Sequence, residues 1–185
     1  LKDDAFPTIV SAIRYGRGVF ENIRRFSIYL FSGNSAEIIA VAAASVVKLP
    51  LPLLPLQILF LNFVLDVFPA LALGFGETRK GVMKEPPRPI GESFLAGRHW
   101  MAIAVFGVII AAPALGALTI GLYVLGLPQE QAVTVSFLAI ALSRLWHVLN
   151  MRSDDTTLWS NEIVSNRLVW AAVALCAVLI VGVVY

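Results

Sequence analysis

The chain has 185 residues, of which 58% are hydrophobic and only 14% are charged, and its mean hydropathy is +0.82. Soluble domains have about 45–50% apolar and about 25% charged residues, so this composition predicts an integral membrane protein in a lipid bilayer. The net charge of +2 is too small to argue for nucleic acid as a partner, and a single cysteine excludes a disulfide framework.

The pattern of apolar and charged residues predicts an all-α protein. Residues 1–25 mix apolar residues with arginines and are expected to form a stalk helix that begins in water. Five apolar runs follow and predict transmembrane helices over residues 26–47, 54–75, 100–125, 132–149 and 169–185. We therefore expect an integral membrane helical bundle of five spans with an N-terminal cytoplasmic stalk helix.

The basic residues predict the orientation. Of the 14 Lys and Arg residues, all except Lys48 and Arg144 lie in the N-terminal segment or in the polar connections 76–98 and 150–167. With five spans these three segments share one side, and the positive-inside rule makes that side cytoplasmic. We expect a multi-pass protein of the plasma membrane with a cytoplasmic N-terminus.

The second apolar run carries an acid where an acid is costly. Asn62 and Asp66 are four residues apart and share one face of a helix. An ionisable group at that depth costs several kcal/mol unless it has a partner or a function. Pro69 also frees the carbonyl of Leu65, because proline has no N–H to donate to it. Oxygen ligands of these kinds suit a hard cation such as calcium or magnesium.

The first apolar run carries a matching pair, Asn34 and Glu37. A tight turn joins the two runs, so the helices are expected to lie antiparallel with Glu37 and Asp66 at similar depth. Two acids and two amides at one depth predict a cation pathway, in a pump, an exchanger or a channel. The alternative is a polar seam that only holds helices together. His99 and His147 are solitary and are interpreted as interfacial residues.

Three stretches resemble a known family. YLFSGNSAEIIA, LPLQILFLNFVLDVFPALALGF and VMKEPPR resemble the C-terminal membrane half of P-type cation-transporting ATPases, in the calcium-pump branch. The resemblance implies that the spans are family helices five to nine. It also implies that Asn34, Glu37, Asn62 and Asp66 are cation ligands. Sodium pumps carry an acid where Asn62 stands, which favours calcium as the cation, with manganese or another cation as alternatives.

The resemblance also implies that this chain is a fragment of a pump. The missing N-terminal part would supply the fourth helix, the phosphorylation domain and the nucleotide-binding domain, where ATP and Mg²⁺ act. The chain opens without methionine, as a fragment would. It is not expected to hydrolyse ATP by itself. The alternatives from other classes are an ion-coupled secondary transporter or exchanger, and a non-transporting membrane scaffold.

This chain departs from the family pattern at three positions. Leu65 stands where the family has threonine, and Val67 stands where it has glycine. The eighth-helix glutamate aligns with Arg144, or with Ser143 if the register slips by one. Arginine cannot ligate a cation. It either turns inward to Glu37 as a built-in counter-charge, or snorkels to the headgroups beside Trp146.

Overall fold

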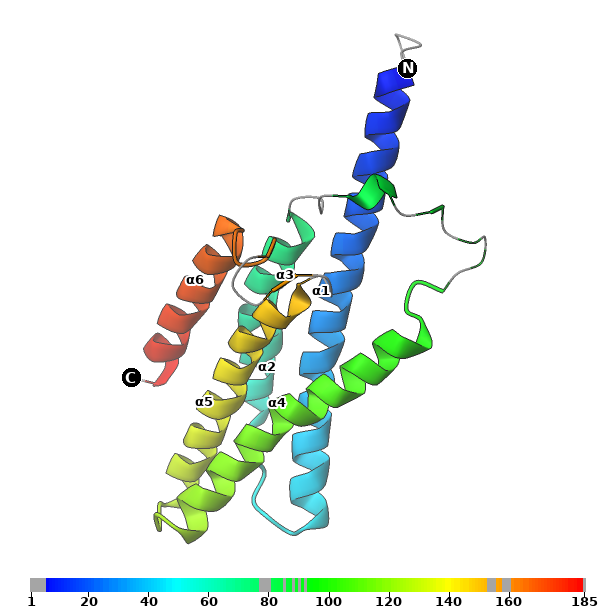
Figure 1. The fold of residues 1–185 in the computed structure, drawn as a ribbon. Coiled ribbons are helices and arrows are strands. Elements are labelled where there is room, and N and C mark those ends of the chain that lie inside the picture. The colour runs from blue at the N-terminus through cyan, green and yellow to red at the C-terminus, as the bar shows by residue number, and fades with distance from the viewer. Residues whose placement is uncertain are drawn as a thin grey trace.

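The computed structural model describes residues 6–76, 81–84, 86, 87, 89, 91, 93–152, 156, 157 and 161–184. These residues form helices and connections without any strand. The elements are α1 (Phe6–Val46), α2 (Pro55–Phe60), the π-helix η1 (Leu61–Leu65), α3 (Val67–Gly74), the 3₁₀ turn η2 (Val82–Lys84), α4 (Gly97–Tyr123), α5 (Gln129–His147), the 3₁₀ turn η3 (Val148–Met151) and α6 (Arg167–Val184) (Figure 1).

The described residues contain five helical segments that are long and apolar enough to cross a membrane. They are Phe6–Val46, Pro55–Gly74, Gly97–Tyr123, Gln129–Met151 and Arg167–Val184. The chain is therefore an all-α membrane helical bundle. Residues 1–5 of the predicted stalk and Tyr185 of the predicted last span lie outside the described residues.

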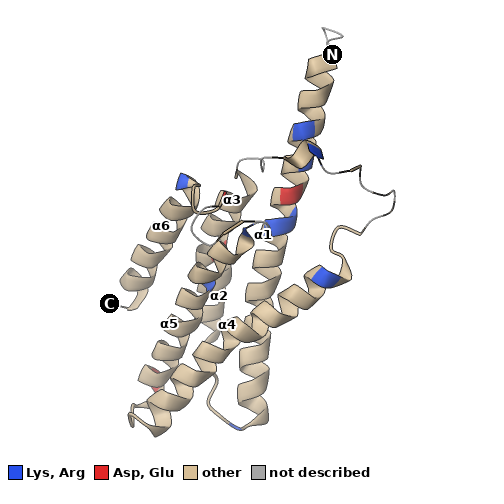
Figure 2. Cartoon of the chain, viewed as in Figure 1, with Lys and Arg blue, Asp and Glu red and all other residues tan. Residues whose placement is uncertain are grey.

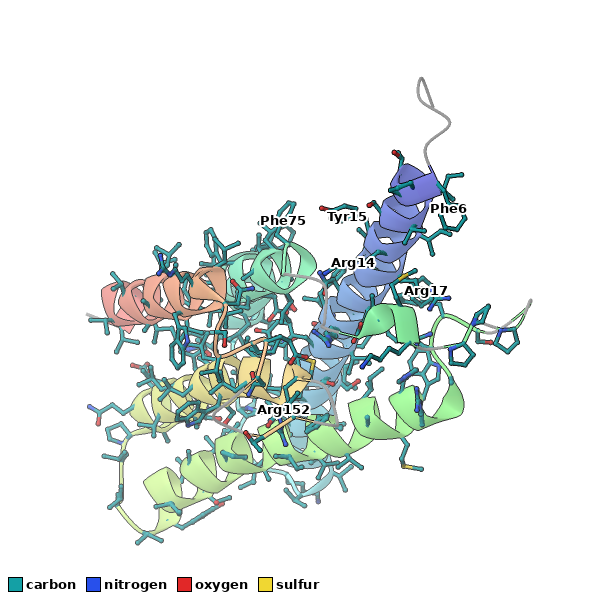
Figure 3. All side chains as sticks on the ribbon, turned by 45° about the horizontal axis from the view of Figure 1, so that its top comes forward. Phe6, Arg14, Tyr15, Arg17, Phe75 and Arg152 are labelled. Atoms are coloured by element: carbon teal, nitrogen blue, oxygen red, sulfur yellow. The ribbon has the colours of Figure 1, made fainter. Side chains whose placement is uncertain are left out.

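The predicted stalk and the predicted first span form one helix. α1 has 41 residues, which at 1.5 Å per residue is about 60 Å. The hydrocarbon core of a bilayer is about 30 Å thick, so α1 is roughly twice the length needed to cross it. Its N-terminal part stands clear of the bundle, and Phe6, Arg14 and Tyr15 project from this part (Figure 3).

The second span is interrupted near its middle. The backbone N–H of Asp66 donates to the carbonyl of Leu61, 3.0 Å away and five residues back, which is the pattern of a π-helix. Pro69 then removes the donor for the carbonyl of Leu65. Single π turns inside α-helices are frequent at functional sites, because they change the direction of the side chains next to them. Here the turn immediately precedes the buried acid.

Small residues allow α1 to pack closely against α4. Ala36, Ala40 and Ala44 recur every four residues along α1 and are fully buried. On α4, Gly107 lies against this face, where a Cβ would meet Ser35 at 3.0 Å. Small residues are the usual means of close helix packing in membranes, where lipid removes the hydrophobic driving force between helices. Figure 1 shows α4 crossing α1 at an angle, with α5 beside α4 and α6 at the edge next to α3.

The polar connections are tied to the middle of α1. The Asn22 amide donates to the carbonyl of Gly76 at 2.6 Å, and Arg17 donates to the carbonyl of Val82 at 3.0 Å. Arg25 pairs with Glu162 at 2.8 Å. Basic residues gather at this end of the bundle, where α1 projects (Figure 2). These contacts mark the level at which the described chain leaves the apolar bundle for its polar end.

Candidate cation site

Arg144 of α5 lies between two acids that come from different helices. Its Nη1 is 3.0 Å from Oε1 of Glu37 on α1, and its Nη2 is 3.5 Å from Oδ2 of Asp66, between η1 and α3. The arginine is 1% exposed, and both acids are buried. A single guanidinium therefore joins three of the five spans at the level of the π turn.

The two predicted asparagines belong to the same network. Nη2 of Arg144 lies 3.4 Å from Oδ1 of Asn34. The Asn62 amide donates to Oε2 of Glu37 at 3.0 Å and to the carbonyl of Ile58 at 2.9 Å. All four residues predicted from the sequence are thus brought together, and each of them touches either Arg144 or Glu37.

The network carries one more negative charge than positive charge when both acids are ionised. Two carboxylates surround one guanidinium, and arginine stays protonated in proteins. Buried charges of this kind persist only when they are paired and hydrogen-bonded. In the part of the chain that the structure describes, there is no group of three or more Asp, Glu, His or Cys side chains that could hold a metal ion. The network by itself is therefore a charge-paired cluster rather than a complete metal centre.

The carbonyl of Leu65, which Pro69 leaves without a helical donor, has a partner on another helix. The thiol of Cys176 on α6 lies 3.8 Å from the carbonyl oxygen of Leu65 and can donate to it. The sequence predicted that this carbonyl could be a cation ligand. In the structure, the carbonyl of Leu65 and the thiol of Cys176 are hydrogen-bond partners, and both residues are fully buried. A free thiol is a weak donor, and a carbonyl without its helical partner is a good acceptor for it.

The structure decides between the two arrangements expected for Arg144. Trp146, two residues further along α5, is 68% exposed, whereas Arg144 is 1% exposed, so they lie on different faces. The expectation that Arg144 snorkels to the headgroups is wrong. The hydroxyl of Ser143 donates to the carbonyl of Ala139 on its own helix at 2.7 Å. Of the two residues that could align with the family's glutamate, Arg144 is the one in the cluster.

An aromatic layer covers the cluster on the side of the polar end. The ring of Tyr29 on α1 stacks on His147 of α5 with centroids 5.9 Å apart, and Phe106 of α4 lies 4.5 Å from the same imidazole. His147 is 2% exposed, so its side chain faces the interior of the bundle. The sequence gives no sign that His147 packs between Tyr29 and Phe106, because this contact forms only where α1, α4 and α5 meet.

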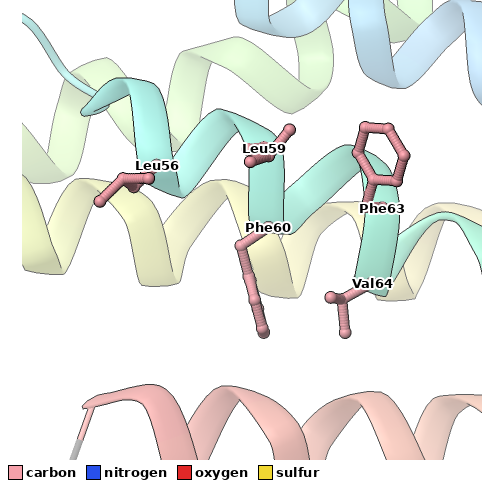
Figure 4. A pocket seen from close by; sticks show the side chains of 5 residues that line it. All are labelled: Leu56, Leu59, Phe60, Phe63 and Val64. Carbon is pink, nitrogen blue, oxygen red and sulfur yellow. The ribbon is translucent and has the colours of Figure 1, made fainter.

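The outer face of the second span is apolar. Leu56, Leu59, Phe60, Phe63 and Val64 line a shallow groove of about 410 Å³. Figure 4 shows that Phe60 and Val64, four residues apart, point to the same side of the helix. Leu56, Leu59 and Phe63 are more than half exposed. Such a face suits acyl chains or another helix, and the polar chemistry of this span is confined to its inner face.

Comparison with known proteins identifies the family of the chain. The family model described as "Cation transporting ATPase, C-terminus" matches residues 50–185. The chain belongs to the cation-transporting ATPase family. A calcium-transporting ATPase of Listeria monocytogenes is 38% identical over 179 residues, which are 97% of this chain and 20% of that protein.

Two further relatives extend the comparison. A calcium-transporting ATPase of Bacillus subtilis is 36% identical over 185 residues, which are all of this chain and 21% of that protein. An endoplasmic-reticulum-type calcium-transporting ATPase of Arabidopsis thaliana is 37% identical over 110 residues, 60% of this chain and 11% of that protein. The chain thus spans about one fifth of the length of its bacterial relatives in the ATPase family. The predicted family resemblance is confirmed.

Proposed function

We propose that this chain supplies part of the intramembrane cation site of an ATP-driven calcium pump. The observation that carries the proposal is the buried network of Glu37 and Asp66 around Arg144, reached by Asn34 and Asn62. Acids inside a bundle of spans are costly and are characteristic of ion pathways. Membership in the cation-transporting ATPase family and the names of the relatives support calcium as the transported ion.

The remaining ligands would come from the rest of the pump. Calcium takes six to eight oxygen ligands, and the network offers two carboxylates and two amide groups, which Arg144 partly engages. The family resemblance assigns the other ligands to the fourth helix, outside this chain. ATP and Mg²⁺ would act in the phosphorylation and nucleotide-binding domains, and this chain would respond to them through α1.

We further propose that the pump carries one cation per cycle. Calcium pumps use the fifth-helix pair, a threonine, the shared aspartate and an eighth-helix glutamate for one of two sites. In this chain Leu65 and Arg144 stand in place of the threonine and the glutamate. A guanidinium offers donors and no acceptors, so it would fill that site as a permanent positive charge. Asn62 and Asp66 would serve the second site.

The orientation follows from the distribution of charge. Basic residues gather at the end where α1 projects, and Lys48 lies in the turn at the opposite end of α1. Under the positive-inside rule, this distribution supports a cytoplasmic location for the projecting end of α1. The plasma membrane is the expected location, because a calcium pump there can expel the ion from the cell.

The test is a change of charge without a change of shape. In the complete pump, Asp66→Asn should abolish calcium-dependent phosphorylation from ATP, since a hard cation depends on the carboxylate charge. Glu162→Gln is the matched control, because Glu162 pairs with Arg25 at the polar end of the bundle. It should leave the calcium dependence unchanged. Calcium dependence within about threefold of wild type in Asp66→Asn would mean that Asp66 is only structural.

Equilibrium binding separates the alternatives. Radioactive calcium should saturate at one ion per pump, and binding of two ions would contradict the role assigned to Arg144. An exchanger would bind the ion without being phosphorylated by ATP. A scaffold would bind none, and its polar network would then only pair the helices with one another.

A further inference from the structure

The guanidinium of Arg144 lies directly against a glycine of α1. A Cβ built on Gly33 would lie 2.7 Å from Nε and 2.8 Å from Cζ of Arg144, and closer still to Nη2. Real Cβ atoms essentially never approach another heavy atom within 3.0 Å. A side chain at position 33 is therefore incompatible with the observed position of the guanidinium.

If the guanidinium of Arg144 gave way, it would move away from the two partners that it has on α1. Asn34 is the next residue after Gly33, and Glu37 is one turn further along the same helix. A Cβ on Gly33 would push the guanidinium away from α1, because that is the direction in which the Cα–Cβ bond points. The contacts of 3.0 Å to Glu37 and 3.4 Å to Asn34 would lengthen. Asp66, on a different helix, would remain as the nearest acid.

We propose that Gly33 is a positioning residue of the cation site. Because Gly33 has no side chain, the guanidinium of Arg144 fits between Glu37 and Asp66. The residue at position 33 thereby determines how the charge of Glu37 is compensated. This inference rests on the proposed role of the network in cation binding. Gly33 acts through Arg144 and is not itself a ligand.

Two other glycines provide matched controls. A Cβ on Gly107 of α4 would meet Ser35 at 3.0 Å and Ile39 at 3.2 Å, which is a tight contact without any charged group. A Cβ on Gly16 of α1 would meet no heavy atom within 4 Å. Gly107→Ala therefore tests steric crowding between helices, and Gly16→Ala tests the effect of alanine on α1 itself.

The experiment is a double-mutant cycle in the complete pump. Gly33→Ala should raise the calcium concentration for half-maximal phosphorylation by about tenfold, within the range of coupled neighbours. The reason is that the displaced guanidinium turns to Asp66 and competes with calcium there. Arg144→Lys removes Nη2, the atom nearest to the built Cβ, and replaces the planar guanidinium with a more flexible ammonium that keeps the positive charge. In that background Gly33→Ala should change the calcium dependence by less than about twofold.

The controls isolate the arginine. Gly16→Ala should leave the calcium dependence unchanged. Gly107→Ala should lower the yield of folded pump without changing the calcium dependence of the folded molecules, and Arg144→Lys should not restore that yield. If Gly33→Ala alone does not fold, folding of Gly33→Ala/Arg144→Lys supports the inference, and failure of both variants overturns it. An equal loss of calcium affinity from Gly33→Ala in the Arg144 and Lys backgrounds also overturns it.

The inference and the proposed function fail separately. The coupling between positions 33 and 144 should also be measurable in the melting temperature of the pump in a calcium chelator, where no cation is bound. Such coupling supports the steric pairing of Gly33 with Arg144 even if Asp66→Asn keeps its calcium dependence. Absence of coupling in the chelator overturns the inference even if one calcium ion binds.

Discussion

Removal of the Arg144 charge is the most direct perturbation of this protein. The guanidinium is 1% exposed and lies 3.0 Å from Glu37 and 3.5 Å from Asp66. Arg144→Met keeps a long, unbranched side chain but removes the positive charge, so both acids are left buried without a counter-charge. Breaking a buried ion pair in this way costs about 3–5 kcal/mol. For a unit of about 150–250 residues that opens cooperatively, about 1 kcal/mol lowers the melting temperature by roughly 2–4 °C, so we expect this bundle to open at a temperature roughly 6–20 °C lower.

A second substitution separates charge from packing. Glu37→Gln removes one of the two charges that Arg144→Met leaves unpaired, and the amide can still accept from Asn62. The double variant should recover most of the lost stability, because replacing both members of a buried pair is often close to neutral. Saturating calcium should also stabilise Arg144→Met, by about 2.7 kcal/mol at one hundred times its dissociation constant.

Cys176 provides the assay. It is fully buried between α6 and the second span, so a thiol-reactive fluorophore labels it only when the bundle opens. The melting temperature is measured in detergent and chelator, on a complete pump in which other cysteines are replaced by serine. Arg14→Met, at an exposed position of α1, is the control and should shift the melting temperature by less than about 2 °C. The reasoning is refuted if Arg144→Met melts within that margin of wild type.

Three further predictions concern the rest of the bundle. A cysteine at position 49 should react with an impermeant reagent on intact cells and one at position 80 should not, and labelling at 80 would contradict the five-span topology. Asn22→Leu should destabilise by about 1–3 kcal/mol in the same melting assay, because it removes the donor at 2.6 Å from the carbonyl after α3. Ser136→Ala should cost about 1 kcal/mol, because it removes the 2.9 Å hydrogen bond between α5 and α4. Thr134→Ala should cost less, because the hydroxyl of Thr134 bonds within α5. Equal losses of stability would argue against the interhelical hydrogen bond.

The amino-acid sequence by itself predicted the membrane class and five spans, and the described residues contain five helical segments that are long and apolar enough to cross a membrane. Transfer of a side chain into lipid depends on its own chemistry, so runs of apolar residues predict spans without knowledge of the fold. The same reasoning identified Asn34, Glu37, Asn62 and Asp66, since polar residues inside such runs are conspicuous. The spacing and the tight turn between the first two spans were enough to predict that these residues share one depth.

Only the tertiary structure decided which way Arg144 faces. The sequence allows a rotation of α5 that sends the arginine to the headgroups and one that sends it to Glu37, and both avoid an unpaired charge inside the membrane. In the folded bundle, Gly33 of α1, more than one hundred residues away in the chain, leaves room for the guanidinium. The same holds for His147 and Cys176, whose partners lie on other helices. Hydropathy is a local property of the chain, whereas the space beside a side chain is created by helices that meet only in the folded bundle.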